Sequence, residues 1–225
     1  MSANAATPRE HLAHQLAEAV AEALRTDLTR QARALLVVSG GSTPVPFFAA
    51  LAHQELAWDR VDITLADERW VAEDATDSNA RLVREHLLVG KAQQARFIPL
   101  TTGHSTPEEG VEEVAGRLEQ LTWPASVVIL GMGGDGHTAS LFPDSRELSL
   151  ALATDATVVA VRTPSQPQAR ITLSAERLHH ALRHVLHISG DDKRTVLGRA
   201  MSGDDVRELP IRAFLSCPLA IYWAP

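Results

Sequence analysis

The stretch LGMGGDGHTASLFP, residues 130–143, combines four glycines, an acid and a histidine, the residue types of a loop that binds an anion or performs acid–base chemistry. From Gly131 it spells G-x-G-x-x-G, the dinucleotide-binding pattern, and also G-x-x-x-x-G-H-T, close to a nucleotide-binding P-loop. The dinucleotide pattern needs a long helix after its third glycine, but Pro143 would cut that helix short. The P-loop pattern needs a lysine where the chain has His137, and histidine cannot supply the constant cation that lysine gives to the phosphates. Neither nucleotide interpretation fits well.

His137 can instead act as a general base. Imidazole titrates near neutral pH, and the glycine-lined loop follows an apolar run that is typical of a buried strand. Asp135 or Asp67 could fix the tautomer of the ring, and the backbone N–H groups around Gly133 and Gly134 could stabilise an oxyanion. The alternative is a capping histidine in a structural loop.

A second glycine-containing segment, VVSGGSTP at residues 37–44, also follows an apolar run. Glycines allow a tight turn with exposed N–H groups, and Pro44 suits the first turn of a helix with Thr43 or Ser42 as its N-cap. A helix N-terminus adds partial positive charge, so this segment could bind a phosphate monoester. The alternative is a plain strand-to-helix turn. The candidate phosphate-binding residues are Gly40, Gly41, Ser42 and Thr43.

A third polar segment, LADERWV at residues 65–71, places acids and a guanidinium directly after an apolar run. Side chains alternate along an extended chain, so Asp67 and Arg69 point to one side and Glu68 to the other. If they face a cleft, Asp67 and Arg69 could orient a base and stabilise a developing negative charge. The commoner alternative is a surface salt bridge at a strand end. Further along, Ser78 suits the N-cap of a helix.

Two weaker segments carry isolated cations that could close over a phosphate. Arg170 begins the short run RITLS, and Lys193 or Arg194 follows an apolar run and a glycine at the expected start of a helix. Such isolated charges are more often ordinary surface groups. We expect His179 and His180, adjacent on a helical face, to be solvated or packed.

These segments must be positioned by the regular elements, in which short apolar runs alternate with helical patterns. The runs are rich in Val, Ile and Leu and mostly continuous, which is typical of strands buried on both faces. We predict strands at residues 34–38, 61–66, 96–100, 126–131, 157–161 and 184–189, and helices near 11–32, 44–54, 78–89, 107–121, 174–183 and 191–201, with the C-terminal tail returning to the sheet. The alternation indicates an α/β fold with an open, mainly parallel, doubly wound (Rossmann-like) sheet and helices on both faces. Such sheets bind ligands at the carboxyl ends of their strands, where the three polar segments are expected.

The composition limits the class of protein. The 225 residues are 45% hydrophobic and 22% charged, which fits one domain over residues 1–225. A formal net charge of −7 without a lysine or arginine cluster argues against nucleic acid as a partner, but not against a small phosphorylated metabolite. The single cysteine excludes an intrachain disulfide and favours a cytoplasmic setting. We expect no secretory signal and no membrane partner, because the N-terminal residues lack an apolar segment and no run reaches roughly 18 apolar residues.

Taken in order, SGGSTP, DERWV…DSNARLVREHLL, GMGGDGHTASLFP and RITLS resemble the 6-phosphogluconolactonases, within the wider glucosamine-6-phosphate isomerase/deaminase-like group. The resemblance runs from about Leu35 to Lys193, and GMGGDGHTASLFP is its specific motif. It implies an open α/β sheet and hydrolysis of 6-phospho-D-glucono-1,5-lactone to 6-phospho-D-gluconate in the oxidative pentose phosphate pathway. It also implies that the reaction uses no cofactor and requires no metal.

By matching motif position, the resemblance implies roles for individual residues. The 6-phosphate would be held by the loop of residues 40–43, Arg170 and Lys193. His137 would be the general base, and Arg69 and Asp67 would line the reacting end of the sugar. A δ-lactone is an activated ester, so water deprotonated by His137 can attack C1, while loop N–H groups or Arg69 stabilise the oxyanion. The phosphate, held far from C1, would fix the orientation of the substrate.

Two other functions remain open. An aldose–ketose isomerase or deaminase of the same group, acting on an amino-sugar phosphate, typically carries an FNEP-like segment after the histidine, whose glutamate serves ring opening and proton transfer. Here the chain reads TASLFPDS, with no glutamate before Glu147. A non-catalytic phosphosugar-binding module would tolerate loss of the histidine or of the acid–arginine pair, and both are present.

The acids directly before Lys193 could turn this lysine away from the cleft and leave Arg194 in its place. The sequence does not determine the oligomeric state, although we favour a monomer.

Overall fold

The computed structural model describes residues 7–225, and its main feature is a six-stranded sheet with the order β4-β2-β1-β5-β8-β9. Its strands are β1 (Ala34–Val38), β2 (Val61–Leu65), β4 (Arg96–Ile98), β5 (Val127–Leu130), β8 (His184–Ser189) and β9 (Leu219–Ala224). Every neighbouring pair is parallel. All residues of β1, β2 and β5 are buried, and β1 and β5 are accordingly continuous apolar runs. β2 also contains Asp62, which pairs with Arg33 and Arg96, and Thr64, which donates to the carbonyl of Ile98. The predicted open parallel sheet, including the return of the C-terminal tail to it, is confirmed.

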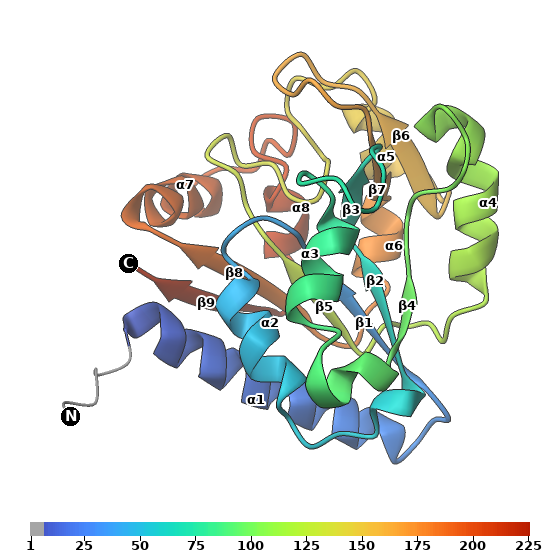
Figure 1. Cartoon of the computed structure of the whole chain (residues 1–225). Coiled ribbons are helices and arrows are strands. Elements are labelled where there is room, and N and C mark those ends of the chain that lie inside the picture. The colour runs from blue at the N-terminus through green and yellow to red at the C-terminus, as the bar shows by residue number, and fades with distance from the viewer. Residues whose placement is uncertain (1–6) are drawn as a thin grey trace.

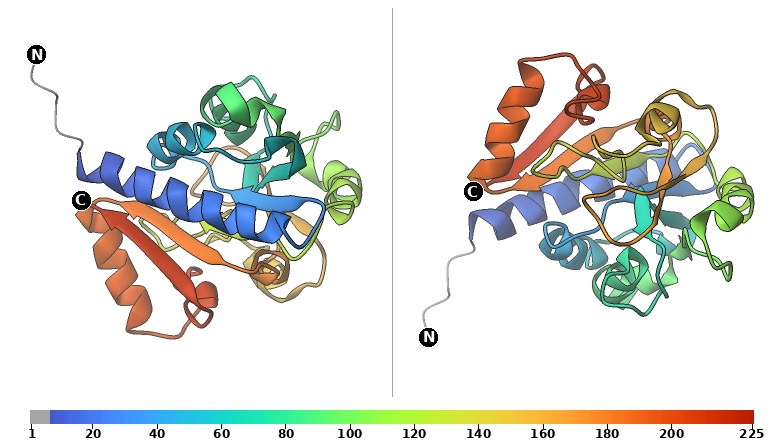
Figure 2. Two further views of the ribbon diagram at one scale, coloured as in Figure 1. Left: turned by 90° about the horizontal axis from the view of Figure 1, so that it is seen from below. Right: turned by 90° about the horizontal axis from the view of Figure 1, so that it is seen from above.

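Helices cover both faces of this sheet, as predicted. In Figure 1, α2 (Val45–Ala52) and α3 (Asn79–His86) lie in front of the sheet, and α6 (Ala175–His179) and α8 (Arg212–Leu215) lie behind it. Seen from below in Figure 2, α1 (Pro8–Leu28) crosses the molecule between α2 and α3 on one side and α7 (Asp191–Met201) on the other. The remaining helical elements are η1 (Trp58–Arg60), η2 (Gly90–Gln94), α4 (Pro107–Glu119) and α5 (Leu148–Ala153).

Three short strands form a separate antiparallel sheet that the sequence analysis did not predict. They are β3 (Asp67–Arg69), β6 (Val158–Val161) and β7 (Arg170–Leu173), in the order β3-β7-β6. The run at 157–161 therefore belongs to this second sheet and not to the main one. The second sheet lies at the top of Figure 1, above the carboxyl ends of the main strands.

Several helices end two to four residues earlier than expected. The helix predicted over 174–183 ends at His179, because Ala181 forms an isolated parallel bridge with Ala125 beside the main sheet. A single domain over residues 1–225 stays a prediction, and residues 1–6 lie outside the described part. Between residues 7 and 225, no helix is both long enough and apolar enough to cross a membrane.

The strand order changes direction between β1 and β5. From β1 the chain moves outward through β2 to β4, whereas from β5 it moves the other way through β8 to β9. At such a switch point the loops that leave the two central strands diverge and open a crevice at the carboxyl edge of the sheet. Here these loops are residues 39–44 and 131–142, so the fold brings the two glycine-containing segments together.

Candidate active site

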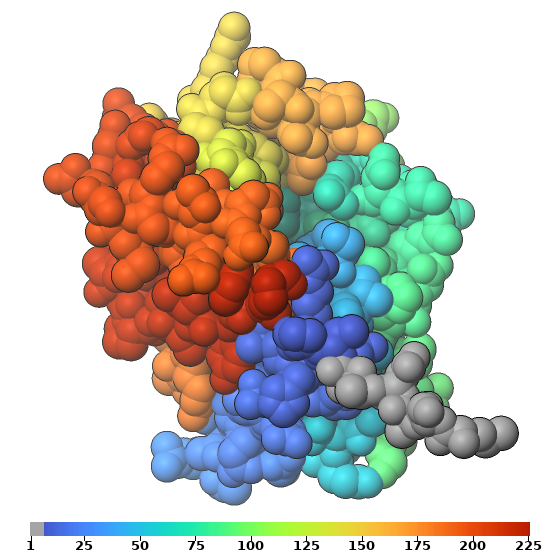
Figure 3. All heavy atoms as spheres, turned by 90° about the vertical axis from the view of Figure 1, so that its left-hand side faces the viewer, coloured from blue at the N-terminus to red at the C-terminus, as the bar shows by residue number. Residues whose placement is uncertain are grey.

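A cleft of about 330 Å³ opens at the carboxyl ends of β1, β5 and β8, and residues of β3 and β7 in the second sheet also line it. Figure 3 shows the surface hollowed where the loop after β5, α7 and the loop after β1 meet. The predicted site residues that line this cleft are Gly40, Gly41, Thr43, Asp67, Arg69, His137, Arg170 and Lys193. Ser42 is exposed and lines a smaller neighbouring cavity instead, so its side chain does not contribute to the cleft. Asp135 does not line the cleft but is hydrogen-bonded to His137, which does.

His137 forms a hydrogen-bonded pair with Asp135. Nδ1 of the ring lies 2.6 Å from Oδ1 of Asp135, and the backbone N–H of His137 donates to the same oxygen at 3.1 Å. Burial raises the pKa of Asp135, but the hydrogen bonds from His137 outweigh this effect and hold the pKa of the carboxyl below its usual value. Since an ionised carboxylate only accepts, Nδ1 carries the ring proton and Nε2 keeps a lone pair. Of the two candidate acids, Asp135 is the partner of His137.

Asp67 is bonded to other groups. Its Oδ2 accepts from the hydroxyl of Ser140 at 2.5 Å and lies 3.5 Å from Nη1 of Arg170. Both partners of this ion pair are buried, and the guanidinium of Arg170 also lies over the ring of Phe142, 5.1 Å from its centroid. The imidazole of His137 also packs against Phe142, with ring centroids 4.3 Å apart. Asp67, Arg170 and Phe142 therefore contact one another along the lining of the cleft.

Arg170 retains an unused donor. Its Nε is buried and has no hydrogen-bond partner within residues 7–225, while Nη2 donates to Gln166 at 3.2 Å. Burial lowers the pKa of Arg170, and the charge of Asp67 opposes this effect. A guanidinium stays cationic in proteins, so Arg170 presents both charge and a donor to a ligand.

Arg69 is positioned by the start of α3 and not by an acid. Its Nη1 donates to the carbonyl of Asp77 at 2.8 Å and to Oδ1 of Asn79 at 2.9 Å. No ion pair of Arg69 occurs in the described part of the chain, and its Nε is buried without a partner. The surface salt bridge considered from the sequence is absent between Asp67 and Arg69. The charge of Arg69 is therefore available to a negatively charged ligand.

Glu68 ties β3 to α3 from the opposite side of the strand, as side-chain alternation predicts. Its carboxylate accepts from the hydroxyl of Ser78, the predicted N-cap of α3, and from three backbone N–H groups, those of Arg69, Asn79 and Ala80. Burial raises the pKa of Glu68 even against these hydrogen bonds. The segments DERW and DSNA thus form one unit that holds Arg69, and the sequence analysis missed this role of Glu68.

The loop after β1 approaches this unit closely at Gly40. A Cβ at Gly40 would lie 1.8 Å from Oδ1 of Asn79, so only glycine allows Asn79 to hold Arg69.

The predicted N-cap of α2 by Thr43 or Ser42 is wrong. Pro44 itself occupies the N-cap position, no side chain caps the helix, and Oγ1 of Thr43 lies 3.3 Å from the hydroxyl of Ser189.

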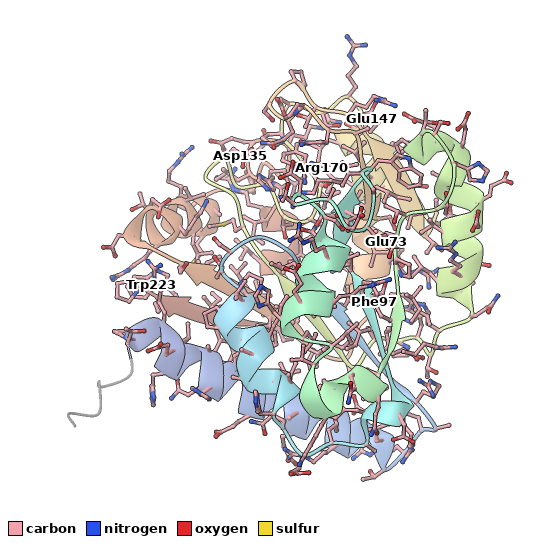
Figure 4. All side chains as sticks on the ribbon, viewed as in Figure 1. Glu73, Phe97, Asp135, Glu147, Arg170 and Trp223 are labelled. Atoms are coloured by element: carbon pink, nitrogen blue, oxygen red, sulfur yellow. The ribbon has the colours of Figure 1, made fainter. Side chains whose placement is uncertain are left out.

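Lys193, and not Arg194, lines the cleft. The guanidinium of Arg194 lies over Trp223, 4.8 Å from the ring centroid, and Figure 4 shows Trp223 on β9, well away from Asp135 and Arg170. Nζ of Lys193 lies near Gly134, 3.7 Å from where a Cβ of that residue would be. The acids before Lys193 do not turn it away from the cleft.

The loop after β5 supplies fewer oxyanion donors than predicted. The N–H of Gly133 donates to the carbonyl of His137 at 2.8 Å, so the prediction was wrong for this group. The N–H of Gly134 makes no backbone hydrogen bond within residues 7–225 and stays a candidate. The same loop contains Ala139, whose φ of +48° lies in the left-handed region. Non-glycine residues adopt this conformation only at a cost in free energy, and residues in such strained conformations are frequent at functional sites.

His187 is a cleft residue that the sequence analysis missed. It lies near the carboxyl end of β8, is buried, and its Nδ1 has no hydrogen-bond partner in the described part of the chain. Burial lowers the pKa of His187 to about 4, so the ring is neutral at physiological pH. A histidine inside an apolar strand resembles an ordinary core residue, and only its position just before the polar turn of HVLHISG indicated otherwise.

The parallel sheet and the cleft at its switch point place the chain among the open α/β proteins that bind a ligand at the carboxyl ends of their strands. It belongs to the glucosamine-6-phosphate isomerase/6-phosphogluconolactonase family, whose model matches residues 7–223. It is similar to the 6-phosphogluconolactonase of Pseudomonas aeruginosa, with 47% identity over 95% of this chain and 90% of that protein. A second such relative, from Mesorhizobium japonicum, is 42% identical over 99% of this chain and 94% of that protein.

Solved structures agree with this assignment. The crystal structure of a 6-phosphogluconolactonase from Shewanella baltica matches with a TM-score of 0.95 and 44% identity, over 96% of this chain and 94% of that one. A monomeric glucosamine-6-phosphate deaminase matches with a TM-score of 0.79 over 97% and 95% of the two chains, but at 16% identity it shows the common fold alone. The family resemblance identified from the sequence motifs is confirmed.

Proposed function

We propose that the chain hydrolyses 6-phospho-D-glucono-1,5-lactone to 6-phospho-D-gluconate, the second step of the oxidative pentose phosphate pathway, with His137 as general base. The observation that carries the proposal is the His137–Asp135 pair, which leaves a basic nitrogen on an imidazole that lines a cationic cleft. The similarity to relatives named 6-phosphogluconolactonase, over at least nine-tenths of both chains, supports the choice of substrate.

In this mechanism His137 takes a proton from a water molecule, whose oxygen attacks C1 of the lactone. The negative charge that develops on the carbonyl oxygen is stabilised by Arg69 or by the N–H of Gly134. Asp135, ionised and bonded to Nδ1, stabilises the imidazolium. The tetrahedral intermediate then breaks the bond between C1 and the ring oxygen, which receives the proton from His137. The products are a carboxylic acid, which ionises at neutral pH, and a hydroxyl group.

The phosphate of the substrate is assigned to the cationic and N–H donors of the cleft. These are the loop of residues 40–43 at the start of α2, Arg170 and Lys193, with Ser42 contributing through its backbone only. Because the chain has a net charge of −7, such local donors must attract the doubly charged phosphate against the overall field.

The deaminase alternative is disfavoured by the position of Glu147. Its carboxylate accepts from the hydroxyl of Ser145 at 2.7 Å and from the N–H of Arg162 at 3.2 Å. It does not line the cleft, and Figure 4 shows it near the top of the molecule, apart from Asp135 and Arg170. The first glutamate after the histidine is therefore not placed to shuttle protons on a substrate in the cleft.

A panel of three substrates tests the proposal: 6-phosphogluconolactone generated in situ, the unphosphorylated gluconolactone, and glucosamine 6-phosphate. We expect acceleration of ring opening over the enzyme-free blank for the phosphorylated lactone, much weaker acceleration without the phosphate, and no release of ammonia from the amino sugar. Ammonia release without lactone hydrolysis would establish the deaminase instead. Inactivity towards all three would leave a phosphosugar-binding protein without chemistry.

A further inference from the structure

Three metal-ligating side chains meet at the opposite end of β8 from the cleft. His179 ends α6, His184 begins β8, and Cys217 lies between α8 and β9. One ligand atom from each lies within 4.8 Å of the other two, the one such group of three found in residues 7–225. Ser189, which lines the cleft, is at the other end of β8, roughly 16 Å away at the usual rise of a strand. The cluster is therefore separate from the candidate active site.

The hydrogen bonding of His184 prepares it to bind a metal. Its Nε2 lies 3.0 Å from the carbonyl oxygen of Leu178. A carbonyl only accepts, so Nε2 carries the ring proton and Nδ1 is left with its lone pair. Metal-binding histidines in proteins usually donate their second ring nitrogen to a carbonyl or carboxylate in this manner, which fixes both tautomer and ring orientation.

The other two side chains are supported by Phe214 of α8. The ring of His179 stacks on the ring of Phe214 with centroids 4.5 Å apart, in agreement with the expectation that this histidine is packed. The thiol of Cys217 donates to the carbonyl of Phe214 at 2.9 Å. Cys217 is partly buried. Figure 1 shows α6 and α8 together behind the main sheet.

We propose that His179, His184 and Cys217 bind a divalent cation of the zinc class, with water as the fourth ligand. Two imidazoles and a thiolate suit tetrahedral zinc, and soft sulfur disfavours magnesium and calcium. At usual bond lengths two nitrogens and a sulfur around tetrahedral zinc are roughly 3.3–3.6 Å apart. The three ligand atoms lie within 4.8 Å of one another, so they must close by at most about 1.5 Å. On binding, Cys217 loses its proton to solvent, and its sulfur exchanges the hydrogen bond to Phe214 for the bond to the metal.

Such an ion would join α6, β8 and the segment before β9, which are distant in sequence. A ligand that binds the folded chain and not the unfolded one stabilises the fold. The proposed site has no part in the hydrolysis, because its residues are at the far end of the sheet from His137. The proposed hydrolysis and the proposed metal site can therefore be refuted independently of each other.

Cobalt provides the test, because a thiolate bound to Co²⁺ gives a near-ultraviolet charge-transfer band and tetrahedral Co²⁺ gives intense visible bands. EDTA-treated protein is titrated with cobalt chloride, and zinc chloride is then added. We expect both sets of bands at one equivalent, and their loss when zinc displaces cobalt. Cys217→Ser should abolish the charge-transfer band. The matched control His180→Gln changes the adjacent histidine, which stacks on Trp123, and should keep it.

Thermal unfolding supplies a second measurement. Zinc should raise the Tm of the wild type and of His180→Gln by several degrees, but not that of Cys217→Ser or His179→Gln. Lactone hydrolysis without metal should be the same in wild type and Cys217→Ser. The proposal would be overturned if the wild type lacked the thiolate-to-cobalt band or if Cys217→Ser kept this band. It would also be overturned if His137→Ala lost the band, because cobalt would then bind in the cleft. If Cys217→Ser fails to fold, His179→Gln replaces it in the cobalt titration. Loss of the cobalt bands in His179→Gln would support the proposal, and their retention would overturn it.

Discussion

Replacing Gly133 with alanine should inactivate the histidine without removing any catalytic group. A Cβ at this position would lie 2.1 Å from Nδ1 of His137 and 2.6 Å from Oδ1 of Asp135, the two atoms of the hydrogen bond that orients the ring. Ordinary contact begins near 3.4 Å, so the ring must move by more than 1 Å. The bond between His137 and Asp135, at 2.6 Å, cannot survive this movement.

The expected magnitude follows from the bond that is lost. A hydrogen bond to a charged group contributes about 1.5–3 kcal/mol, which corresponds to about 10- to 100-fold in rate. Misplacement of a reacting group by about 1 Å costs on the order of 100-fold. We therefore expect Gly133→Ala to lower kcat for lactone hydrolysis by about 100-fold, with a much smaller change in KM because the phosphate-binding groups are untouched.

Gly134→Ala is the matched control, because it adds the same methyl group to the same loop and keeps the backbone N–H of residue 134, the candidate oxyanion donor. Its Cβ would meet only Nζ of Lys193, at an ordinary 3.7 Å, so kcat should stay within a few-fold of the wild type. Initial rates with lactone generated in situ, corrected for spontaneous opening, give kcat and KM for both variants. Circular dichroism checks that both are folded. Equal kcat values for the two folded variants would refute the assignment of His137 and Asp135 as a catalytic pair.

Further predictions concern the phosphate, the acid and the buried histidine. Lys193→Ala should raise KM for the phosphorylated lactone about tenfold or more, because a charge-assisted contact with the phosphate is lost. Arg194→Ala removes the neighbouring cation, which lies over Trp223, and should leave KM nearly unchanged. If steady-state kinetics gave the same KM for both variants, Lys193 would not be a phosphate-binding residue. Asp135→Asn should lower kcat by roughly 10²–10⁴-fold by losing the tautomer and the stabilisation of the imidazolium, and kcat within a few-fold of wild type would contradict this role. The pKa of His187 is about 4 in the folded chain, against an ordinary value of 6.5. As the pH falls below 6.5, the unfolded chain therefore takes up a proton at this residue before the folded chain does. The free energy of unfolding is unaffected by His187 above pH 6.5 and decreases as the pH drops towards 4. Urea unfolding at pH 7.5 and 4.5 should therefore show a loss on acidification that is about 2–3 kcal/mol smaller in His187→Gln than in the wild type, and equal losses would show that the ring is not buried as described.

The centre of the main sheet was predictable because β1, β2, β5 and β8 are buried almost throughout. In β1 and β5 burial leaves a continuous apolar run in the sequence, and glycines follow at the carboxyl ends of both strands. The second sheet was not predictable in the same way. Its strands are three or four residues long, and β3 pairs with β7 about a hundred residues later, so neither periodicity nor a local turn indicates the pairing.

The candidate site shows the same division between local and distant contacts. The spacing of Asp135 and His137 already permits an Asx-type turn, in which the acid accepts the N–H two residues on, and this turn selects Asp135 over Asp67. The role of Glu68 depends on the start of α3, and the pairing of Asp67 with Arg170 depends on the second sheet. Such contacts arise only from the folded chain.

The turnover of lactone by the wild type and by His137→Ala tests the central claim most directly. Both proteins are supplied with 6-phosphogluconolactone generated in situ, at concentrations that span KM, beside an enzyme-free blank. The account predicts acceleration by the wild type and a kcat lower by roughly 10²–10⁴-fold in the variant, with little change in KM. Near-normal turnover in the variant, or no acceleration by the wild type, would contradict it.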